Sequence, residues 1–374
     1  MKNFLGAFAD GAILFPIIAV LSLQNGFSGV TLLATAGLAY LATALIFRIP
    51  MSVQPLKAIA IAAVALGATS SEIRVSGALL GVACLLLSVR RVERLAKKIP
   101  AGLVHSVQLG IGLVLMRQGF KFGFQGVHPL WQMGVTFGVT AALLASTAFL
   151  EFPVLGLVAT VGIFWAVVAG LHTAAATGTT PLLAMVGTSA GESLRLGIIA
   201  SLIFPQLVLT FFNSVVATQN VAQRYYGQQA SRVTISRLMR SIGIGNILSA
   251  AVAGLPYCHG SGGLTAHYRG GARHWVMGIY IGVTLLIFAL VQQLGGHVSL
   301  QYPAPLLSGL LITVGIFHLG LAKPTWVTPA GKRQLVAAGL AAVITQNMLW
   351  VLAAALVLEI GNALAARNVE EFVS

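Results

Sequence analysis

The chain has 374 residues, of which 57% are hydrophobic and only 8% are charged, and its mean hydropathy is +0.91. Soluble domains carry about a quarter charged residues, so this composition excludes a large soluble protein. The formal net charge of +14 would suit nucleic-acid binding, but Lys and Arg gather in four short segments between apolar runs, at 90–98, 224–240, 269–273 and 323–333. Basic loops of this kind mark the cytoplasmic side of membrane proteins, so no nucleic-acid partner is expected.

Apolar stretches recur along the whole chain, and many have the length of about 18–20 residues that a helix needs to cross a bilayer. The predicted spans are residues 4–23, 30–47, 55–67, 75–89, 101–118, 130–148, 153–171, 196–217, 241–254, 260–270, 275–293, 303–319 and 335–360. The last range fits one tilted helix or a hairpin of two, so we expect 13 or 14 spans. A cytoplasmic N-terminus places all four basic segments inside; in a prokaryote the protein would lie in the inner (cytoplasmic) membrane.

The predicted spans divide into two halves. Residues 1–171 form a first repeat of about seven spans, residues 172–195 form a linker rich in Thr, Gly and Ala, and residues 196–374 form a second repeat. In each half the third span is short and follows an irregular stretch that contains Pro or Gly, and Pro50 of one stretch matches Pro256 of the other. A matched pair of interrupted segments indicates an inverted-repeat transporter, whereas two separate packing kinks are the alternative.

The two interrupted segments predict a binding site for an anion. Non-helical backbone at membrane depth is tolerated where protein or water satisfies it, and a helix that begins there directs free N–H groups and a positive dipole end into the same space. Gln54 and His259 could donate hydrogen bonds to an oxyanion, and Lys57 could offset its charge; a helix-capping His259 and a Lys57 paired with a carboxylate are the alternatives. The candidate substrate-binding residues are Ser52, Gln54, Lys57, Asn213, Cys258, His259, Gly260, Ser261, Gly262 and Gly263.

Asp10 is the only aspartate of the chain and lies inside the first predicted span. An ionisable residue within the membrane is costly and suggests a function, which we take to be the coupling of anion transport to a proton or a sodium ion. The alternative is a buried carboxylate that orders the site by accepting backbone hydrogen bonds. Asn213 is a candidate counterpart in the second half, because it lies 43 residues before Pro256 and Asp10 lies 40 residues before Pro50.

Four segments of the chain resemble the molybdate transporter family, a branch of the sulfate permease superfamily. Residues 50–60 resemble its signature P-M-x-V-Q-P-M-K-A-I-A, and residues 256–273 are similar to its second signature, P-x-C-H-G-A-G-G-L followed by Y-R-F-G-A-R. Residues 212–217 resemble the element T-N-A-V-I-A, and residues 6–16 resemble the opening G-A-L-G-D-L-G-T-F-I-P. The chain departs from these patterns at Leu56 (usually Met), at Ser261 (usually Ala) and at residues 12–14 (usually G-T-F).

The resemblance implies an all-α integral membrane protein with the seven-plus-seven inverted-repeat fold of uracil and sulfate permeases. Two short broken helices would face each other at the midplane, and a core domain would move against a gate domain. The implied function is secondary active transport of molybdate by alternating access, with sulfate and tungstate as the next candidates. A carrier or channel for another anion, a nucleobase-type permease and a homodimeric assembly remain open.

The chain lacks two motifs that mark common enzyme classes. It contains no H-E-x-x-H and no phosphate-binding loop of the G-x-x-x-x-G-K-[ST] type, so we expect neither an enzyme nor ATP hydrolysis by this chain. The two cysteines, Cys84 and Cys258, form no disulfide framework and no metal-ligand spacing. We therefore expect no cofactor and no metal site, and the lipid bilayer and a small oxyanion are the expected partners.

Overall fold

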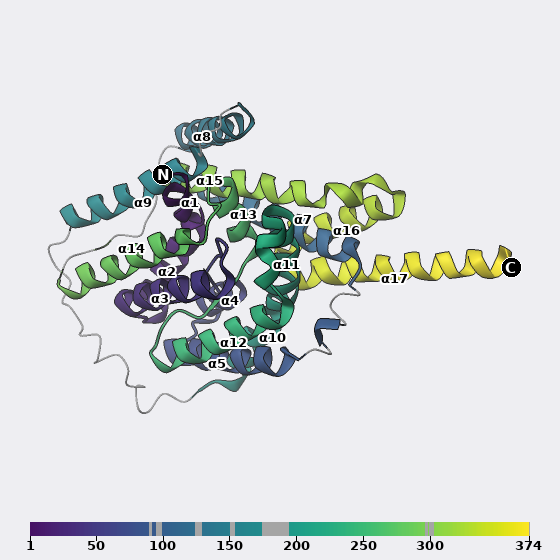
Figure 1. Cartoon of the computed structure of the whole chain (residues 1–374), viewed down its shortest axis with the longest axis horizontal. Coiled ribbons are helices and arrows are strands. Elements are labelled where there is room, and N and C mark those ends of the chain that lie inside the picture. The colour runs from purple at the N-terminus through teal and green to yellow at the C-terminus, as the bar shows by residue number, and fades with distance from the viewer. Residues whose placement is uncertain are drawn as a thin grey trace.

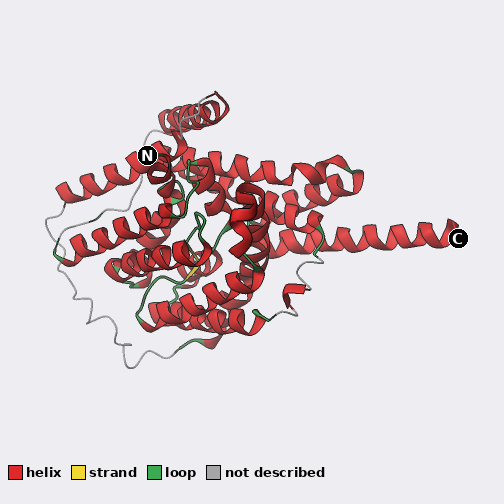
Figure 2. Ribbon diagram, in the orientation of Figure 1, coloured by secondary structure: helices red, strands yellow, loops and turns green. Residues whose placement is uncertain are grey.

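A computed structural model of the chain describes residues 1–89, 92–94, 99–123, 129–149, 154–173, 194–295, 298 and 303–373. Within these residues the chain is helical except for loops and one pair of two-residue strands, which Figure 2 shows near the centre of the molecule. The predicted all-α membrane fold is therefore confirmed. Most of the predicted linker, residues 174–193, lies outside the described residues.

In the described part of the first half, a short N-terminal helix is followed by one strand and seven helices of ten residues or more. These elements are α1 (Lys2–Ala7), α2 (Gly11–Asn25), α3 (Gly29–Phe47), β1 (Gln54–Pro55), α4 (Lys57–Leu66), α5 (Ser70–Leu87), α7 (Ala101–Gly123), α8 (Pro129–Phe149) and α9 (Val154–Thr173). The half-length helix α4 occupies the place of the third predicted span, as expected.

The second half repeats this order, again with a half-length helix in third place. Its elements are α10 (Leu196–Leu209), the π-helix η2 (Thr210–Ala217), α11 (Thr218–Tyr226), the 3₁₀-helix η3 (Gly227–Arg232), α12 (Ile235–Ala251), β2 (Tyr257–Cys258), α13 (Ser261–Arg269), α14 (Val276–Gln293), α15 (Ala304–Leu319), the 3₁₀-helix η4 (Gly320–Val327), α16 (Pro329–Thr345) and α17 (Met348–Val373). In Figure 1, the C-terminal end of α17 projects away from the rest of the molecule.

The structure resolves the last predicted span and changes the first. The range 335–360 is two helices, α16 and α17, because Gln346 ends α16 in the left-handed conformation with φ +54°. The range 4–23 is interrupted, since α1 ends at Ala7 and a turn leads to Asp10, which precedes the first residue of α2. Asp10 thus lies at a break between helices and not inside one.

Several helices are long and apolar enough to cross a membrane. In the described part of the chain, five meet both conditions of length and hydropathy: Gly29–Phe47, Ser70–Leu87, Leu196–Arg232, Val276–Gln293 and Ala304–Val327. Shorter apolar helices cover Gly11–Asn25, Leu130–Ser146, Val154–Trp165 and Met348–Leu364. Several such helices in one chain are those of an integral membrane protein that crosses the bilayer more than once.

Three helix pairs pack through facing glycines: α3 with α14, α5 with α12, and α7 with α15 (Figure 1). A Cβ atom at any of these glycines would lie 2.7–2.9 Å from the carbonyl oxygen of the partner glycine, which is too close for the backbones to remain in place. Small residues at helix contacts allow the close packing on which membrane helices depend. The pairs are Gly37 with Gly282, Gly81 with Gly243, and Gly112 with Gly315.

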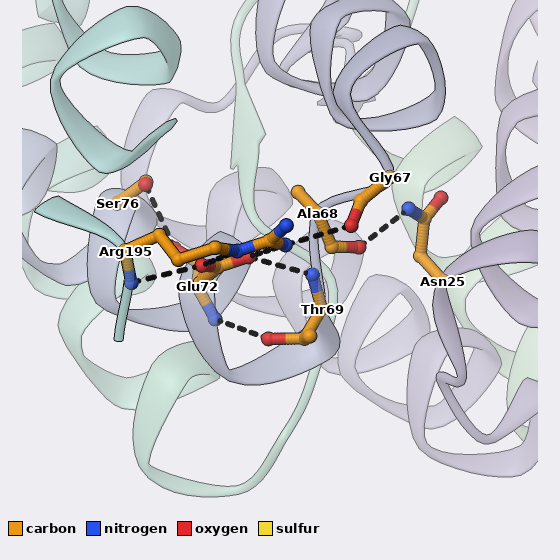
Figure 3. Close-up of polar contacts among 7 residues, drawn as sticks. All are labelled: Asn25, Gly67, Ala68, Thr69, Glu72, Ser76 and Arg195. Carbon is orange, nitrogen blue, oxygen red and sulfur yellow. Dashed lines mark hydrogen bonds and ion pairs between the residues drawn. The ribbon is translucent and has the colours of Figure 1, made fainter. Parts of the chain in front are cut away.

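A polar cluster anchors the C-terminal end of α4 to the start of the second half (Figure 3). The Arg195 guanidinium donates two hydrogen bonds to the Glu72 carboxylate, from Nε at 2.8 Å and from Nη2 at 2.7 Å, and Nη2 also donates to the carbonyl of Gly67 at 2.8 Å. Gly67 ends α4 with φ +56°, so a cation binds the negative end of the helix dipole. The half-helix is therefore fixed at the end remote from the strands.

The same cluster begins α5 with a reciprocal cap. The Thr69 hydroxyl accepts from the backbone N–H of Glu72 at 3.2 Å, and the Glu72 carboxylate accepts from the backbone N–H of Thr69 at 2.9 Å. Asn25, the last residue of α2, donates to the carbonyl of Ala68 at 2.9 Å (Figure 3). These bonds give the cluster a structural role, because they join the ends of α2, α4 and α5.

The glycine contacts generate a test of the packing. Gly81→Ala places a Cβ 2.8 Å from the Gly243 carbonyl, so we expect it to destabilise the protein by about 1–3 kcal/mol through overpacking. Gly138→Ala in α8 is the matched control, because nothing lies within 4 Å of its Cβ position. Thermal unfolding in detergent measures both variants. Equal melting temperatures for the two would contradict the close α5–α12 contact.

Candidate functional site

The two strands hold the beginnings of α4 and α13 against each other. They pair antiparallel, with Gln54 opposite Cys258 and Pro55 opposite Tyr257, and the N–H of Leu56 extends the ladder to the carbonyl of Pro256 at 3.0 Å. Each strand runs directly into its helix, so α4 and α13 begin close together. The pairing also satisfies backbone polar groups that would otherwise be exposed in the membrane. The facing of the two short helices that the sequence predicts is confirmed.

Asp10, Gln54 and Lys57 form a chain of hydrogen bonds beside this strand pair. Gln54 donates from Nε2 to Asp10 Oδ1 at 2.6 Å and accepts from Lys57 Nζ at 2.9 Å. The orientation of the Gln54 amide follows from this, because an ammonium can only donate. The structure therefore brings the predicted coupling residue and two predicted binding residues together through one amide.

Asp10 and Lys57 each keep hydrogen-bonding capacity that no described residue uses. Asp10 is 1% exposed, and no described residue donates to its second carboxylate oxygen, Oδ2. The Lys57 ammonium has three donors, of which one reaches Gln54, and its side chain is partly exposed. A buried oxygen and a partly free ammonium next to each other provide places for a small cation or proton and for an anion.

Two glycines of the α13 segment are required by the position of Gln54. A Cβ at Gly260 would lie 1.8 Å from Gln54 Oε1, and a Cβ at Gly263 would lie 2.3 Å from Asp10 Oδ2 and 2.6 Å from Gln54 Nε2. At Gly262 the nearest atoms belong to Leu115 and Ile111 of α7, at 3.7 and 3.9 Å, which is ordinary contact distance. The absence of a Cβ at Gly260 and Gly263 therefore leaves room for Gln54 and Asp10, whereas a Cβ at Gly262 would meet no atom closer than ordinary contact distance.

The N-terminus of α13 retains free hydrogen-bond donors. Its first backbone N–H groups, those of Ser261, Gly262 and Gly263, have no acceptor among the described residues, and the first helical bond is donated by Leu264 to Gly260 at 3.1 Å. Unpaired N–H groups at a helix N-terminus, together with its dipole, bind anions well. The sequence analysis predicts such donors for a helix that begins within the membrane.

The N-terminus of α4 is different, because a side chain from the second half caps it. Gln206 of α10 is fully buried, and its Oε1 accepts from the N–H of Ala58 at 2.9 Å and of Ile59 at 3.3 Å. Its Nε2 donates to the hydroxyl of Thr210 at 3.0 Å. The sequence analysis missed Gln206, although a buried amide was indicated by its position as the one amide in the apolar residues of α10, Leu196–Leu209.

The hydroxyl of Ser261 links three elements at the start of α13. It donates to Asn213 Oδ1 at 2.6 Å and lies 3.2 Å from His318 Nε2, so Asn213 of η2, Ser261 and His318 of α15 form one network. His318 is fully buried, and no described residue bonds its Nδ1. Asn213 lies in a π-helical stretch, a form of helix that often occurs at functional sites. The sequence analysis did not place His318 at the site.

Ser52 and His259 bond within the protein and hold the loops of the site. Ser52 donates from Oγ to the carbonyl of Gly260 at 2.8 Å. His259 donates from Nδ1 to the carbonyl of Ser52 at 2.9 Å, and its Nε2 lies 2.9 Å from the Ser241 hydroxyl. Because a carbonyl only accepts, the proton lies on Nδ1, and Nε2 accepts from Ser241. In this structure both ring nitrogens of His259 are bonded, and neither bond caps a helix end, so the helix-capping alternative is not what the structure shows.

The remaining predicted residue, Cys258, is a free thiol in β2 that is 3% exposed. Among the described residues no group of three or more His, Cys, Asp or Glu could hold a metal ion. The ten predicted binding residues and Asp10 thus gather around the strand pair. Of these, the backbone groups of Ser261, Gly262 and Gly263 and the ammonium of Lys57 retain donors for a ligand.

Solved structures with a similar fold include anion transporters. The chain matches the structure titled "The transmembrane domain of a cyanobacterium bicarbonate transporter BicA" with a TM-score of 0.57 and 15% identity, covering 95% of this chain and 97% of that one. It matches murine Slc26a9, described as an anion transporter in the inward-facing state, with a TM-score of 0.64 and 13% identity, covering 98% of this chain and 68% of that one. At these identities the likeness shows the fold, which is the predicted one.

Curated relatives share sequence with the chain, one over most of its length and another over about a third of it. "Molybdate transporter 2" of Arabidopsis thaliana is 26% identical over 358 residues, which covers 83% of this chain and 76% of that protein. "Molybdate transporter 1" of Chlamydomonas reinhardtii is 32% identical over 128 residues, or 32% of this chain and 24% of that protein. Residues 2–115 and 199–317 match the family described as "Molybdate transporter of MFS superfamily". The chain therefore belongs to the molybdate transporter family, and it is a membrane transporter of anions and not an enzyme.

Proposed function

We propose that this chain is a secondary active transporter that carries molybdate across the membrane by alternating access. The observation that carries the proposal is the open N-terminus of α13, which the strand pair holds beside the N-terminus of α4 and beside Lys57. The relatives that are named molybdate transporters support molybdate as the first substrate to test. Sulfate and tungstate are also tetrahedral oxyanions, and their oxygens could accept hydrogen bonds from the same donors.

The proposed anion site combines backbone donors with one side-chain charge. The oxygens of the anion would accept from the N–H groups of residues 261–263, and the Lys57 ammonium would supply a full positive charge. A helix N-terminus adds the equivalent of roughly half a charge. This combination suits a small dianion that leaves the water for a membrane-embedded site, because such an ion needs several donors at once.

We assign the coupling role to Asp10. Its Oδ2 is buried without a described partner while Oδ1 is bonded to Gln54, so the carboxylate has one oxygen available for a proton or a sodium ion. Gln54 would transmit the charge state of Asp10 to Lys57, because it bonds to both. A cation at Asp10 would then favour anion binding at the adjacent site.

We further propose the repeat boundaries 1–171 and 196–374 with the linker 172–195, and a cytoplasmic N-terminus. The packing supports two equivalent halves, because the contact of α3 with α14 becomes that of α12 with α5 when the halves are exchanged. The gate domain would consist of α7–α9 and α15–α17, and the rest of the chain would form the core domain. The bond between Ser261 and His318 would then cross from core to gate at the anion.

Uptake of labelled molybdate into proteoliposomes tests the proposal. We expect saturable uptake that sulfate and tungstate reduce and that uracil does not affect. Exchange that depends on molybdate on the opposite side would identify a carrier, whereas flux independent of it would identify a channel. Competition by uracil without competition by oxyanions would contradict the substrate assignment.

Lys57→Gln is expected to lower the affinity for molybdate at least about tenfold, because the site loses its only proposed side-chain cation and the Asp10 charge remains uncompensated. Lys332→Gln on the exposed face of α16 is the matched control and should bind molybdate as the wild type does. Titration calorimetry on the purified proteins measures both. An unchanged affinity of Lys57→Gln would remove Lys57 from the site.

Asp10→Asn retains an oxygen for the bond from Gln54 but cannot carry the charge. We therefore expect exchange of molybdate between the two sides to persist, while accumulation driven by a proton or sodium gradient is lost. Counterflow and gradient-driven uptake at several pH values and sodium concentrations separate the two activities. If the variant still accumulates molybdate with the wild-type pH and sodium dependence, Asp10 is not the coupling residue.

Gly263→Ala and Gly262→Ala compare a crowded position of α13 with a neighbouring position that has room for a methyl group. The first variant places a Cβ 2.3 Å from Asp10 Oδ2, so we expect lost uptake and a lower melting temperature; the second has ordinary contacts and should fold as the wild type does. Uptake and thermal unfolding of both variants provide the check. Equal behaviour of the two would show that Gln54 and Asp10 do not pack against α13 as described.

A further inference from the structure

The two half-helices of the site differ in what their N-terminal N–H groups bind. At α4 the carboxamide oxygen of Gln206 accepts from Ala58 and Ile59, at 2.9 and 3.3 Å. At α13 the N–H groups of residues 261–263 have no acceptor among the described residues. The inverted repeat therefore provides two similar helix ends, of which the protein fills one with its own side chain and leaves the other open.

The orientation of Gln206 is determined by its partners. Backbone N–H groups only donate, so the oxygen of the amide faces α4, and Nε2 donates to Thr210 Oγ1 at 3.0 Å. Gln206 is 0% exposed, so water does not compete for these bonds. The side chain therefore holds a neutral acceptor at the place where an oxygen of an anion would otherwise bind to α4.

The neutrality of this acceptor has an electrostatic consequence. A carboxylate in the same place would also satisfy the N–H groups. It would, however, cancel the positive end of the α4 dipole and offset the charge of the Lys57 ammonium, which belongs to the first turn of the same helix. A neutral amide satisfies the donors and leaves the positive potential to the ligand. The interaction energy with that potential is proportional to the charge of the ligand, so a dianion gains twice as much as a monoanion of the same shape.

We propose that Gln206 is a specificity-determining residue: its uncharged amide closes the N-terminus of α4 to anions and preserves the positive potential that favours a tetrahedral dianion over a monoanion at α13. This inference rests on the proposed oxyanion transport. Gln206 acts on the ligand through the electrostatic potential at the proposed anion site and not by contact. Its bonds to Ala58 and Ile59 fix its position at the N-terminus of α4.

Molybdate and perrhenate provide the test, because both are tetrahedral oxyanions and they carry two charges and one charge, respectively. Gln206→Glu is expected to lower the affinity for molybdate at least about tenfold and that for perrhenate by only about the square root of that factor. Gln223→Glu on the exposed face of α11 is the matched control and should leave the affinity ratio unchanged. Titration calorimetry on the full-length protein in detergent gives both dissociation constants.

Gln206→Met separates charge from structure and keeps the test decisive if Gln206→Glu does not fold. It removes the acceptor without adding a charge, so the ratio of molybdate to perrhenate affinity should stay at or above the wild-type value. A fall in the ratio for Gln206→Met, an unchanged ratio for Gln206→Glu, or an equal loss of both ligands in both variants would overturn the specificity role. If the wild-type protein binds neither oxyanion, the proposed function fails first, whereas wild-type binding with an unaltered Gln206→Glu ratio contradicts this inference alone.

Discussion

The pairing of β1 with β2 is the constraint on which the rest of the site depends. Backbone that leaves its helix inside a membrane must find partners, and the strands supply them to each other, with Gln54 opposite Cys258 and Pro55 opposite Tyr257. Because each strand leads into a helix of about half the membrane thickness, the pairing fixes two helix N-termini in one place. The proposed anion site therefore follows from the way in which the chain satisfies its backbone hydrogen bonds in the bilayer.

The two helix ends then acquire different tasks. Glycines at the start of α13 allow Gln54 and Asp10 to approach the backbone and leave its N–H groups open, whereas Gln206 accepts from two of the three corresponding groups of α4. Lys57 extends from the capped helix towards the open one through its bond with Gln54. The proposed site is thus asymmetric: one half of the chain would supply the cation, and the other half would supply the backbone donors.

Much of this arrangement could be predicted from the sequence, and the physical limits of the prediction are visible in particular residues. Hydropathy located the helices, and the interrupted segments around Pro50 and Pro256 located the candidate site, because several Pro or Gly residues close together break the helical pattern of a sequence locally. The partners of His259 could not be predicted, since Ser52 and Ser241 lie far from it in the sequence or on another helix. Gln206 and His318 were missed for the same reason: their roles arise from contacts across 147 and 57 residues.

The position of the bound anion tests this account most directly. Tungstate scatters X-rays anomalously, and a crystal of the protein grown with tungstate would locate the metal atom without reference to the protein density. We expect a single peak at the start of α13, with oxygens within hydrogen-bond distance of the N–H groups of residues 261–263 and of Lys57 Nζ, while Gln206 still caps α4. A peak away from the strand pair, or one that displaces Gln206 and binds α4 alone, would contradict it.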